Sequence, residues 1–371
     1  MYSTLVRPSD LEELVSIART TAVEAEHARR VAASLIAALR RSGLALAAAP
    51  MSVGGTNPTP SDLLEIVREV SRADASAGWV TMIYVTSAAA AHWIPPAGLP
   101  DIFQKGSHTL LAGVVAPRGQ AESTSDGFRL SGRWAFGSGA ADADWIGLGA
   151  VIDGEPGRTA IFHVPRELVS IVDTWDVVGL RASASHDLEV DGAPVPERLV
   201  SYLDQPPHTT EAIARFPVYG LLAAGIAAVG IGLAESALAA GIELAGGKTP
   251  TGSKRRLADR PAFQEAVARA HAGLESAWHY LADVVSGAET TATLSERVRL
   301  RLAATAAVEA SRSAVDSIYT LAGGSSIYAG SPLQRYLRDI HTASQHMMIA
   351  QPTWELTGRV LLGLDSQPVG L

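Results

Sequence analysis

The sequence contains no cysteine among its 371 residues. This absence excludes disulfide bonds, thiolate catalysis, iron–sulfur clusters and cysteine-ligated zinc sites. It is also compatible with the cytoplasm. The N-terminus begins with Met1–Arg7 and then turns acidic, so it lacks the basic and apolar regions of a secretory signal peptide. We therefore expect a cytoplasmic protein whose chemistry does not depend on thiols.

Positive charge is scarce as well. Lys and Arg total 30 against 38 Asp and Glu, which gives a formal net charge of −8. Such a balance argues against non-specific binding to nucleic acids. The densest basic cluster is Lys254-Arg255-Arg256, and the sequence has no tract of five or more basic residues. We expect no nucleic-acid partner.

One long uncharged run, at residues 216–234, raises the question of a membrane span. Its length is close to that of a spanning helix. However, the run is rich in Ala and Gly, where a span would be rich in Leu, Ile and Phe, and no basic cluster flanks it closely. Glu235 ends the run while the helical pattern continues. We expect a buried helix of a bundle and no membrane association.

Hydrophobic periodicity changes twice along the chain. Apolar residues recur at helical spacing from residue 8 to Pro95-Pro96. Short β-branched and aromatic runs separated by turn residues then extend from about Thr109 to Tyr202, as is typical of an all-β module. Four long Ala-rich helical segments follow, which indicate a four-helix bundle: residues 216–245, 260–287, 293–323 and 333–362.

This order of elements predicts a mainly α fold with a β-domain. The expected domains are an N-terminal helical domain (1–108), a middle β-barrel or sandwich (109–205) and a C-terminal four-helix bundle (206–371). Helices, then strands, then helices is not the strand–helix alternation of a doubly wound nucleotide-binding sheet.

Several familiar motifs are absent. The stretch Gly241–Thr249 approaches a phosphate-binding loop, but it has one residue too many before Lys248 and it follows a helix. There is no HExxH and no G-x-S-x-G. His341 and His346 are five residues apart, which is about 140° around a helix, so they would not share the face that paired metal ligands need. We expect no metal site.

The stretch GRWAFGSGAADADW, from Gly132 to Trp145, is the most informative part of the β-module. A strand ending in aromatic residues is followed by Gly-Ser-Gly and by a second strand that begins with tryptophan. Composition alone favours a β-hairpin with core tryptophans. A second interpretation is that Ser138 and bare backbone N–H groups face a flat apolar wall, which would suit an aromatic heterocycle with polar ring atoms.

Taken in order with other motifs, this stretch carries a family resemblance over nearly the whole chain. The chain resembles the acyl-CoA dehydrogenase superfamily, and more closely the two-component, reduced-flavin-dependent monooxygenases of that fold, the group D hydroxylases. The co-linearity of the pieces carries the resemblance: Pro50 with Gly54-Gly55, Asp74–Trp79, Gly132–Trp145, Gly179-Leu180-Arg181 leading to Val195-Pro196-Glu197, and Gly323-Gly324 followed by Arg335 and Arg338-Asp339.

The resemblance implies a flavin between the β-domain and the bundle, in a homotetramer whose partner subunit touches the cofactor. A separate reductase would supply reduced FMN or FAD. Oxygen would add at C4a, and the C4a-hydroperoxyflavin would hydroxylate an aromatic, heteroaromatic or amine small molecule. By position, Ser138 would face flavin N5, Phe136 and Trp134 would be aromatic contacts to the cofactor, Lys248 would lie at the pyrophosphate, and Gly323-Gly324 would contact the nucleotide end across the dimer.

The resemblance also singles out His346. Many of the dehydrogenases carry a glutamate base shortly after the Arg-Asp pair. Here that position falls at Met347, which cannot accept a proton. In the monooxygenase branch a histidine at this place could donate a hydrogen bond to the peroxy group or take a proton from a phenol or amine.

The predicted catalytic residues are therefore His346, His92 and Ser138. His92 also fits a helix C-terminal histidine favoured by the helix dipole, and His341 fits a solvated or structural residue. Two other functions stay open. A true FAD-dependent acyl-CoA dehydrogenase would keep its base on another helix, with Glu235 and Glu243 as candidates, and a catalytically silent relative would bind flavin or another ligand without reaction.

Overall fold

The computed structural model describes residues 5–288 and 293–364. The chain divides into two compact units. The first unit comprises the chain up to Asp62, Val80–Asp176 and Arg181–Val218, and the second comprises Leu63–Trp79, Val177–Leu180 and the chain from Tyr219 onward. The predicted N-terminal block, 1–108, thus contributes to both units, and the division into three domains stays a prediction.

The first unit combines helices with the sheet. Its helices are α1 (Pro8–Ala28), α2 (Ala33–Ser42), most of α4 (Ala75–Ala90), α5 (Leu99–Ile102) and α6 (Ala212–Arg215). The helix α2 ends at Gly43, whose φ of 69° is the left-handed conformation that glycine adopts without strain. This is the stop that the sequence predicts.

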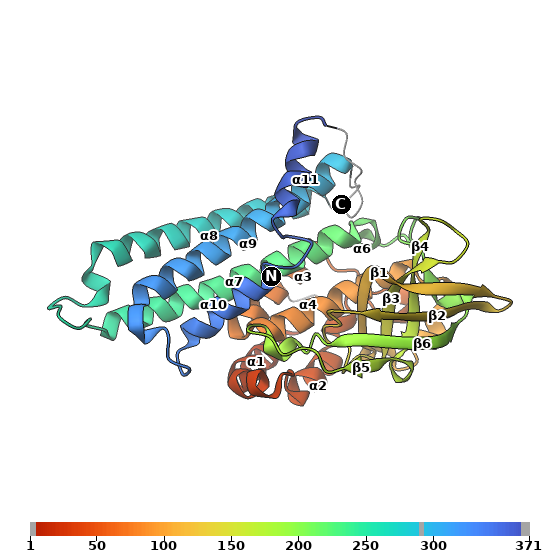
Figure 1. Ribbon diagram of the computed structural model, residues 1–371, viewed down its shortest axis with the longest axis horizontal. Helices are drawn as coiled ribbons and strands as arrows, with labels where there is room; N and C mark the ends of the chain where they lie inside the picture. The colour runs from red at the N-terminus through yellow and green to blue at the C-terminus, as the bar shows by residue number, and fades with distance from the viewer. Residues whose placement is uncertain (1–4, 289–292, 365–371) are drawn as a thin grey trace. The chain divides into compact units, whose positions relative to one another are not determined.

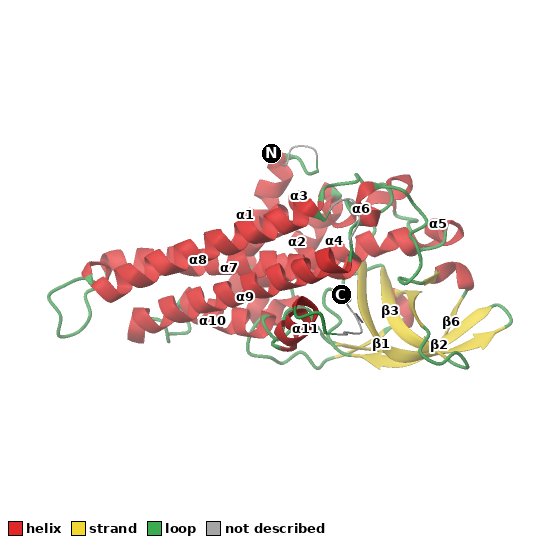
Figure 2. Cartoon of the chain, turned by 90° about the horizontal axis from the view of Figure 1, so that it is seen from above, coloured by secondary structure: helices red, strands yellow, loops and turns green. Residues whose placement is uncertain are grey.

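A seven-stranded mixed sheet forms the rest of the first unit (Figure 2). Its order is β5-β6-β2-β1-β3-β4-β7. The pair β1–β3 is parallel and every other neighbouring pair is antiparallel. The strands are β1 (Leu111–Thr124), β2 (Gly127–Trp134), β3 (Trp145–Ile152), β4 (Thr159–Pro165), β5 (Ser170–Val172), β6 (Asp187–Val195) and β7 (Val200–Ser201).

The interpretation of Gly132–Trp145 as a hairpin is wrong. The strand β2 ends at Trp134 and β3 begins at Trp145, as the aromatic residues suggested, but β1 lies between them in the sheet and pairs with both. The connection at residues 135–144 therefore passes over the end of β1 and is free to build something other than a tight turn.

The second unit is a helical bundle. Its elements are most of α3 (Pro60–Ala73), with α7 (Val218–Gly247), α8 (Pro261–Gly287), α9 (Leu294–Ala322), α10 (Pro332–Ala343) and α11 (Pro352–Leu361). The long helices α8 and α9 run side by side, and α10 and α11 pack against α9 (Figure 1).

The uncharged run in α7 is buried, and its small residues let neighbouring helices pack closely against it. This helix is long and apolar enough to span a membrane by composition, but 83% of its most apolar window is buried inside the protein. A Cβ atom at Gly232 would lie 2.3 Å from the carbonyl oxygen of Arg68 in α3, and one at Gly241 would lie 2.3 Å from Ile318 in α9. Glycine thus lets α7 approach both neighbours closely, as expected for a core helix of a bundle.

The predicted helix at 333–362 is two helices. The first, α10, ends at Ala343, and the second, α11, begins at Pro352, whose missing N–H suits a first helical turn. His341 is helical, whereas His346 lies in the turn region between the helices. The expectation that the two histidines share one helix, separated by an angle around its axis, is therefore wrong.

Candidate functional site

A strained turn holds Ser138 in the first unit. Phe136 has a φ of 67°, a left-handed value that is uncommon for a residue with a side chain. The N–H groups of this segment are paired: Ser138 N donates to Phe136 O (2.9 Å), Gly137 N to His186 O (2.9 Å) and Gly139 N to Ser183 O (3.2 Å). The expectation of bare N–H groups is therefore wrong, because the protein itself uses them.

The two glycines of Gly-Ser-Gly allow this close docking. A Cβ atom at Gly137 would lie 2.5 Å from the side chain of Leu188. Gly139 has a φ of 68°, and a Cβ there would lie 3.1 Å from the ring of Tyr84. The Tyr84 hydroxyl donates a hydrogen bond to the Gly139 carbonyl at 2.9 Å, which fixes the turn from the other side.

Three buried serine hydroxyls lie at this turn, each within hydrogen-bond distance of the next. Ser138 Oγ lies 2.6 Å from Ser185 Oγ, and Ser183 Oγ lies 2.7 Å from the same Ser185 atom. The three residues are 5%, 1% and 3% exposed for Ser138, Ser183 and Ser185. Sequence reasoning identified Ser138 and missed the other two, whose signal is the alternating Ser-Ala-Ser after Gly179-Leu180-Arg181.

The aromatic residues of the segment have opposite environments. Phe136 is 69% exposed, and its ring contacts Trp175 edge-on with 6.1 Å between ring centroids. An exposed phenyl ring beside a buried hydroxyl suits a flat aromatic group with polar ring atoms, so these residues fit a flavin. Trp134 is fully buried, and its Nε1–H donates to Gly149 O at 2.7 Å. Its ring belongs to the core of the first unit, and a contact of Trp134 with the cofactor stays a prediction.

His346 occupies the turn after α10 in the second unit. The backbone N–H of Met348 donates to its Nδ1 at 3.2 Å. A nitrogen that accepts a hydrogen bond carries no proton, so the proton of the neutral imidazole is on Nε2. The ring lies edge-on to Trp79, with 5.8 Å between ring centroids. Within the described residues, Nε2 has no hydrogen-bond partner.

Burial and a neighbouring cation keep this imidazole neutral. Burial is the larger cause, and the positive charge of Arg301 is the second; together they lower the pKa of His346 to about 4. Arg301, on α9, is only 5% exposed, and burial lowers its own pKa to about 10. At neutral pH His346 therefore presents an N–H donor.

His92 in the first unit has neither nitrogen available. Its side chain is fully buried, with Nε2 3.0 Å from Ala48 O and Nδ1 2.5 Å from Thr209 Oγ1. Because a carbonyl oxygen only accepts, Nε2 donates to Ala48 and Nδ1 accepts from the Thr209 hydroxyl. Burial lowers the pKa of His92, so the ring is a neutral link between two chain segments.

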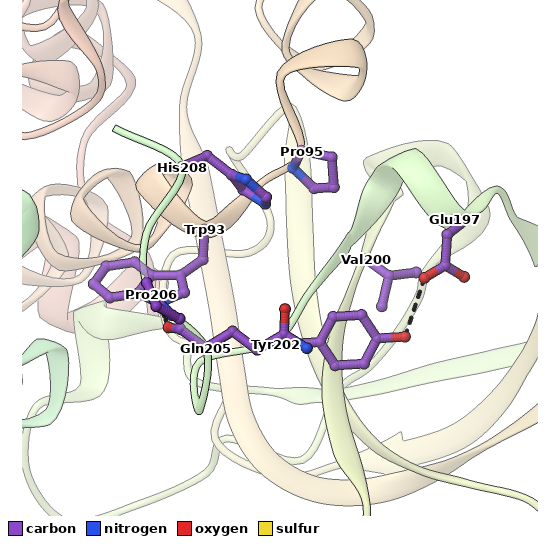
Figure 3. Close-up of a pocket in the computed structure, with 8 residues that line it drawn as sticks. All are labelled: Trp93, Pro95, Glu197, Val200, Tyr202, Gln205, Pro206 and His208. Atoms are coloured by element: carbon purple, nitrogen blue, oxygen red, sulfur yellow. Dashed lines mark hydrogen bonds between the residues drawn. The ribbon is translucent and has the colours of Figure 1, made fainter. Parts of the chain in front are cut away.

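A hollow of about 200 Å³ lies next to His92 along the chain (Figure 3). Its walls include Trp93, Tyr202 and His208, and the Tyr202 hydroxyl donates to Glu197 at 3.2 Å. The ring of His92 is not part of these walls. The hollow therefore does not give His92 access to a ligand.

Lys248 and Gly323 lie close together in the second unit. Lys248 Nζ donates to the carbonyl of Ala322 at 2.5 Å. The next residue, Gly323, has a φ of 59° and a ψ of −148°, a combination essentially restricted to glycine. Gly324 follows it at the surface. A cation and a glycine pair thus meet at the end of α9.

Within the second unit, the segment 178–180 meets the Arg338-Asp339 pair. Leu180 N donates to Asp339 Oδ1 at 2.6 Å, and the Arg338 guanidinium donates to Val178 O. A Cβ atom at Gly179 would lie 2.1 Å from Arg338 O. Only glycine can occupy position 179, which explains why a Gly-Leu pair faces an Arg-Asp pair.

Comparison with known proteins decides the family. Residues 224–351 match the family described as acyl-CoA dehydrogenase, C-terminal domain. The chain is 30% identical over 365 residues to indole-3-acetate monooxygenase of Acinetobacter baumannii, with 94% of this chain and 92% of that protein covered. The chain belongs to the flavin-dependent monooxygenases of the acyl-CoA dehydrogenase fold.

Two further relatives agree with this assignment. The oxygenase component of FADH2-dependent resorcinol hydroxylase from Rhizobium sp. is 31% identical, with 94% of this chain and 91% of that protein covered. The solved structure of XiaF from Streptomyces sp. in complex with FADH2 and glycerol has a TM-score of 0.91 at 28% identity, covering 96% of this chain and 95% of that one. The predicted fold class, oxidoreductase class and reduced-flavin cofactor are confirmed.

Of the two carboxylates that a dehydrogenase could use as its base, one is paired with arginines and the other is exposed. Glu235 lies between Arg68 and Arg72, with 2.6 Å to Arg72 Nε and a further contact to the Arg68 guanidinium. Glu243 is exposed on α7. His341 is exposed and lies 2.8 Å from Asp316, in line with a solvated residue. None of the three offers a base in a dry site.

Proposed function

We propose that this monooxygenase hydroxylates an aromatic, heteroaromatic or amine small molecule, with O2 and with reduced FMN or FAD delivered by a separate reductase. The bound reduced flavin would activate O2 and supply one oxygen atom to the substrate. The observation that carries the proposal is the Nε2–H of His346, which no group of the described chain accepts. It is neighboured by Met347, at the place where a dehydrogenase would need a carboxylate base.

His346 acts in this proposal as a hydrogen-bond donor. Its Nδ1 already accepts from Met348, and its lowered pKa leaves it little tendency to bind a second proton at neutral pH. The role of a proton acceptor, which the sequence left open, is therefore disfavoured. A donor held in a dry site stabilises developing negative charge on oxygen by about 3 kcal/mol in other enzymes.

Other residues would hold the flavin. Ser138 offers a buried hydroxyl, and Phe136 offers an exposed ring for stacking. In the second unit, Lys248 offers a cation beside the glycine pair Gly323-Gly324 for the phosphate end. We infer a structural role for His92, because both of its ring nitrogens are bonded to protein.

We further infer a homotetramer in the cytoplasm that takes reduced flavin from its reductase by diffusion or transient contact. Apolar side chains left exposed in the second unit support an assembly: Ile327, Tyr328, Leu361 and Leu362 are 68%, 71%, 67% and 76% exposed. Contact with a second copy of the chain would remove this apolar surface from water.

The test begins with the purified protein alone. It should be nearly colourless, and it should consume O2 only when reduced FMN or FAD is supplied. With a panel of phenols, indoles and aryl amines, mass spectrometry should detect a product heavier by one oxygen atom. A yellow protein that is bleached anaerobically by an acyl-CoA would instead identify a dehydrogenase, and a protein that does neither would be a silent relative.

A further inference from the structure

Residues 173–176 follow β5 without regular secondary structure, yet each of them is anchored within the first unit. Arg29 of α1 donates to the two carboxylate oxygens of Asp173 at 2.9 and 2.7 Å, and to the backbone oxygen of Trp175 at 3.2 Å. The other anchors join Thr174 to Asp187 through two hydrogen bonds of 3.0 Å, and Asp176 to Arg181 at 3.2 Å. These four residues, the Trp175 segment, are therefore held as a fixed part of the unit.

His186 joins the Trp175 segment to the strained turn that carries Phe136. Its Nδ1 accepts a hydrogen bond from the backbone N–H of Trp175 at 3.2 Å, and its carbonyl oxygen accepts one from Gly137 N at 2.9 Å. Burial is the main reason that the pKa of His186 lies below its usual value, so the neutral ring predominates at neutral pH and can accept at Nδ1. One residue thus ties together the backbones that carry the two aromatic side chains.

The rings of Phe136 and Trp175 are set edge-on. Their centroids are 6.1 Å apart and their planes are 88° from parallel. Such a contact covers at most one face of one ring, so Phe136 keeps a face for stacking, and its side chain is 69% exposed. Exposed side chains change rotamer readily, and ordering one when a ligand binds lowers the affinity. A neighbouring ring that holds Phe136 beforehand would reduce that cost.

We propose that Trp175 is a positioning residue for the flavin: its edge contact holds the Phe136 ring ready to stack on the flavin ring system, and Arg29 and His186 hold Trp175 in place. The inference rests on the proposed contact between Phe136 and the flavin. It requires no direct contact between Trp175 and the cofactor. Trp175 supplies order that flavin binding would otherwise have to impose on Phe136.

The aromatic ring of Trp175 should matter more than its volume. Trp175→Ala and Trp175→Leu should weaken flavin binding by about three- to ten-fold, the range expected for the loss of one aromatic pair. Trp175→Phe keeps a ring edge and should stay within about two-fold of wild type. In a Phe136→Ala background no ring is left to hold, so Trp175→Ala should add no further loss.

Arg29→Ala separates positioning from stability. The ion pair between Arg29 and Asp173 lies at the surface, with the Asp173 side chain 65% exposed, so its loss should leave the unfolding temperature close to that of wild type. A loosened Trp175 segment should still weaken flavin binding by about two- to three-fold. This loss should be absent when Trp175 is already alanine.

The experiment measures dissociation constants for reduced FMN and reduced FAD by anaerobic equilibrium dialysis, with an unfolding temperature for each protein. Tyr202→Ala is the matched control, because Tyr202 is a partly exposed aromatic residue of the same unit that also contacts an arginine, Arg158. Should Trp175→Ala fail to fold, the comparison of Trp175→Leu with Trp175→Phe gives the decision.

The expected result is weaker binding in the Ala and Leu variants, near-normal binding in Trp175→Phe and Tyr202→Ala, and no effect of Trp175→Ala once Phe136 is alanine. Equal binding by the Leu and Phe variants, or an undiminished loss in the Phe136→Ala background, would overturn the inference. So would a Phe136→Ala variant that binds flavin as tightly as wild type. A wild type that binds reduced flavin but hydroxylates no substrate would reject the proposed function alone, because binding is measured without turnover.

Discussion

His92 and His346 are the same residue type put to opposite uses. His92 is fully buried and both ring nitrogens are bonded to protein groups. His346 has one nitrogen bonded to the Met348 backbone, and within the described residues the other has no partner. Burial lowers the pKa of both. The two histidines therefore differ in whether an N–H is left for a ligand and not in charge. We propose that this difference gives His92 a structural role and His346 a catalytic one.

The largest effect is expected for His346→Ala. Removing a catalytic hydrogen-bond donor lowers rates about 100-fold in other enzymes, and here the loss should appear as hydrogen peroxide released in place of hydroxylated product. The ratio of product to reduced flavin consumed measures it. His346→Gln should retain part of the coupling, because its side-chain amide can still donate. Unchanged coupling in the alanine variant would remove His346 from the mechanism.

His92→Ala should have the opposite effect, with a large loss of stability and little loss of coupling. Loss of the ring leaves Ala48 O and Thr209 Oγ1 without their buried partner, so we expect the free energy of unfolding to fall by about 2–4 kcal/mol. The folded fraction should keep its product-to-flavin ratio within about three-fold of wild type. Denaturant unfolding and single-turnover coupling measure the two effects. A stable but uncoupled variant would show that His92 is catalytic and that the comparison is wrong. Thr209→Ala, which removes one bond, is the milder control, at about 1 kcal/mol.

A third histidine extends the comparison to pH. His163 is 6% exposed and bonded to Ser201, and burial lowers its pKa from 6.5 to about 4. Between these values the unfolded state binds a proton that the folded state does not, so stability is full above pH 6.5 and falls as the pH drops to about 4. The loss is about 3 kcal/mol at most. Denaturant unfolding between pH 4 and 8 should show it, and His163→Asn should flatten that slope.

The same histidine pKa values predict a flat activity profile. His346 stays neutral above about pH 4 to 5, so coupling should not titrate with a histidine pKa between pH 6 and 9. A step in the product-to-flavin ratio near pH 6.5 that disappears in His346→Gln would show that the ring gains a proton during turnover.

The smallest effect is expected from alanine substitutions at two neighbouring glycines, Gly323 and Gly324. Gly323 has a φ of 59°, so Gly323→Ala should cost about 1–3 kcal/mol of stability. A Cβ atom at Gly324 would meet nothing within 4 Å among the described residues, and Gly324→Ala should stay within about 0.5 kcal/mol. Thermal unfolding measures both. Equal effects would mean that backbone strain does not distinguish the pair.

The sequence predicted the long helices well, because an Ala-rich pattern with helical period over thirty residues leaves few alternatives. Predictions from the sequence failed for the sheet, because the order of strands along the chain does not determine their order in the sheet. Trp134 and Trp145 flank a short connection and so suggested a hairpin, yet β1 separates their strands. The signal for the break before α11 was Pro352, which a continuous apolar pattern concealed.

The candidate site was predicted in part. Resemblance identified Ser138 and His346, but whether a histidine has a free N–H depends on contacts such as Met348 N to Nδ1, which no spacing reveals. Ser185 escaped notice because Ser-Ala-Ser is unremarkable until folding brings it to Ser138, 47 residues away. Arg301 escaped because an arginine on an amphipathic helix is ordinarily a surface residue.

The central claim is that this protein transfers an oxygen atom from O2. A single turnover under oxygen-18 gas, with reduced flavin and an aromatic substrate, tests it most directly. The account predicts a product carrying one oxygen-18 atom in wild type and its replacement by labelled hydrogen peroxide in His346→Ala. A product without oxygen-18, or anaerobic reduction of bound oxidised flavin by an acyl-CoA, would contradict it.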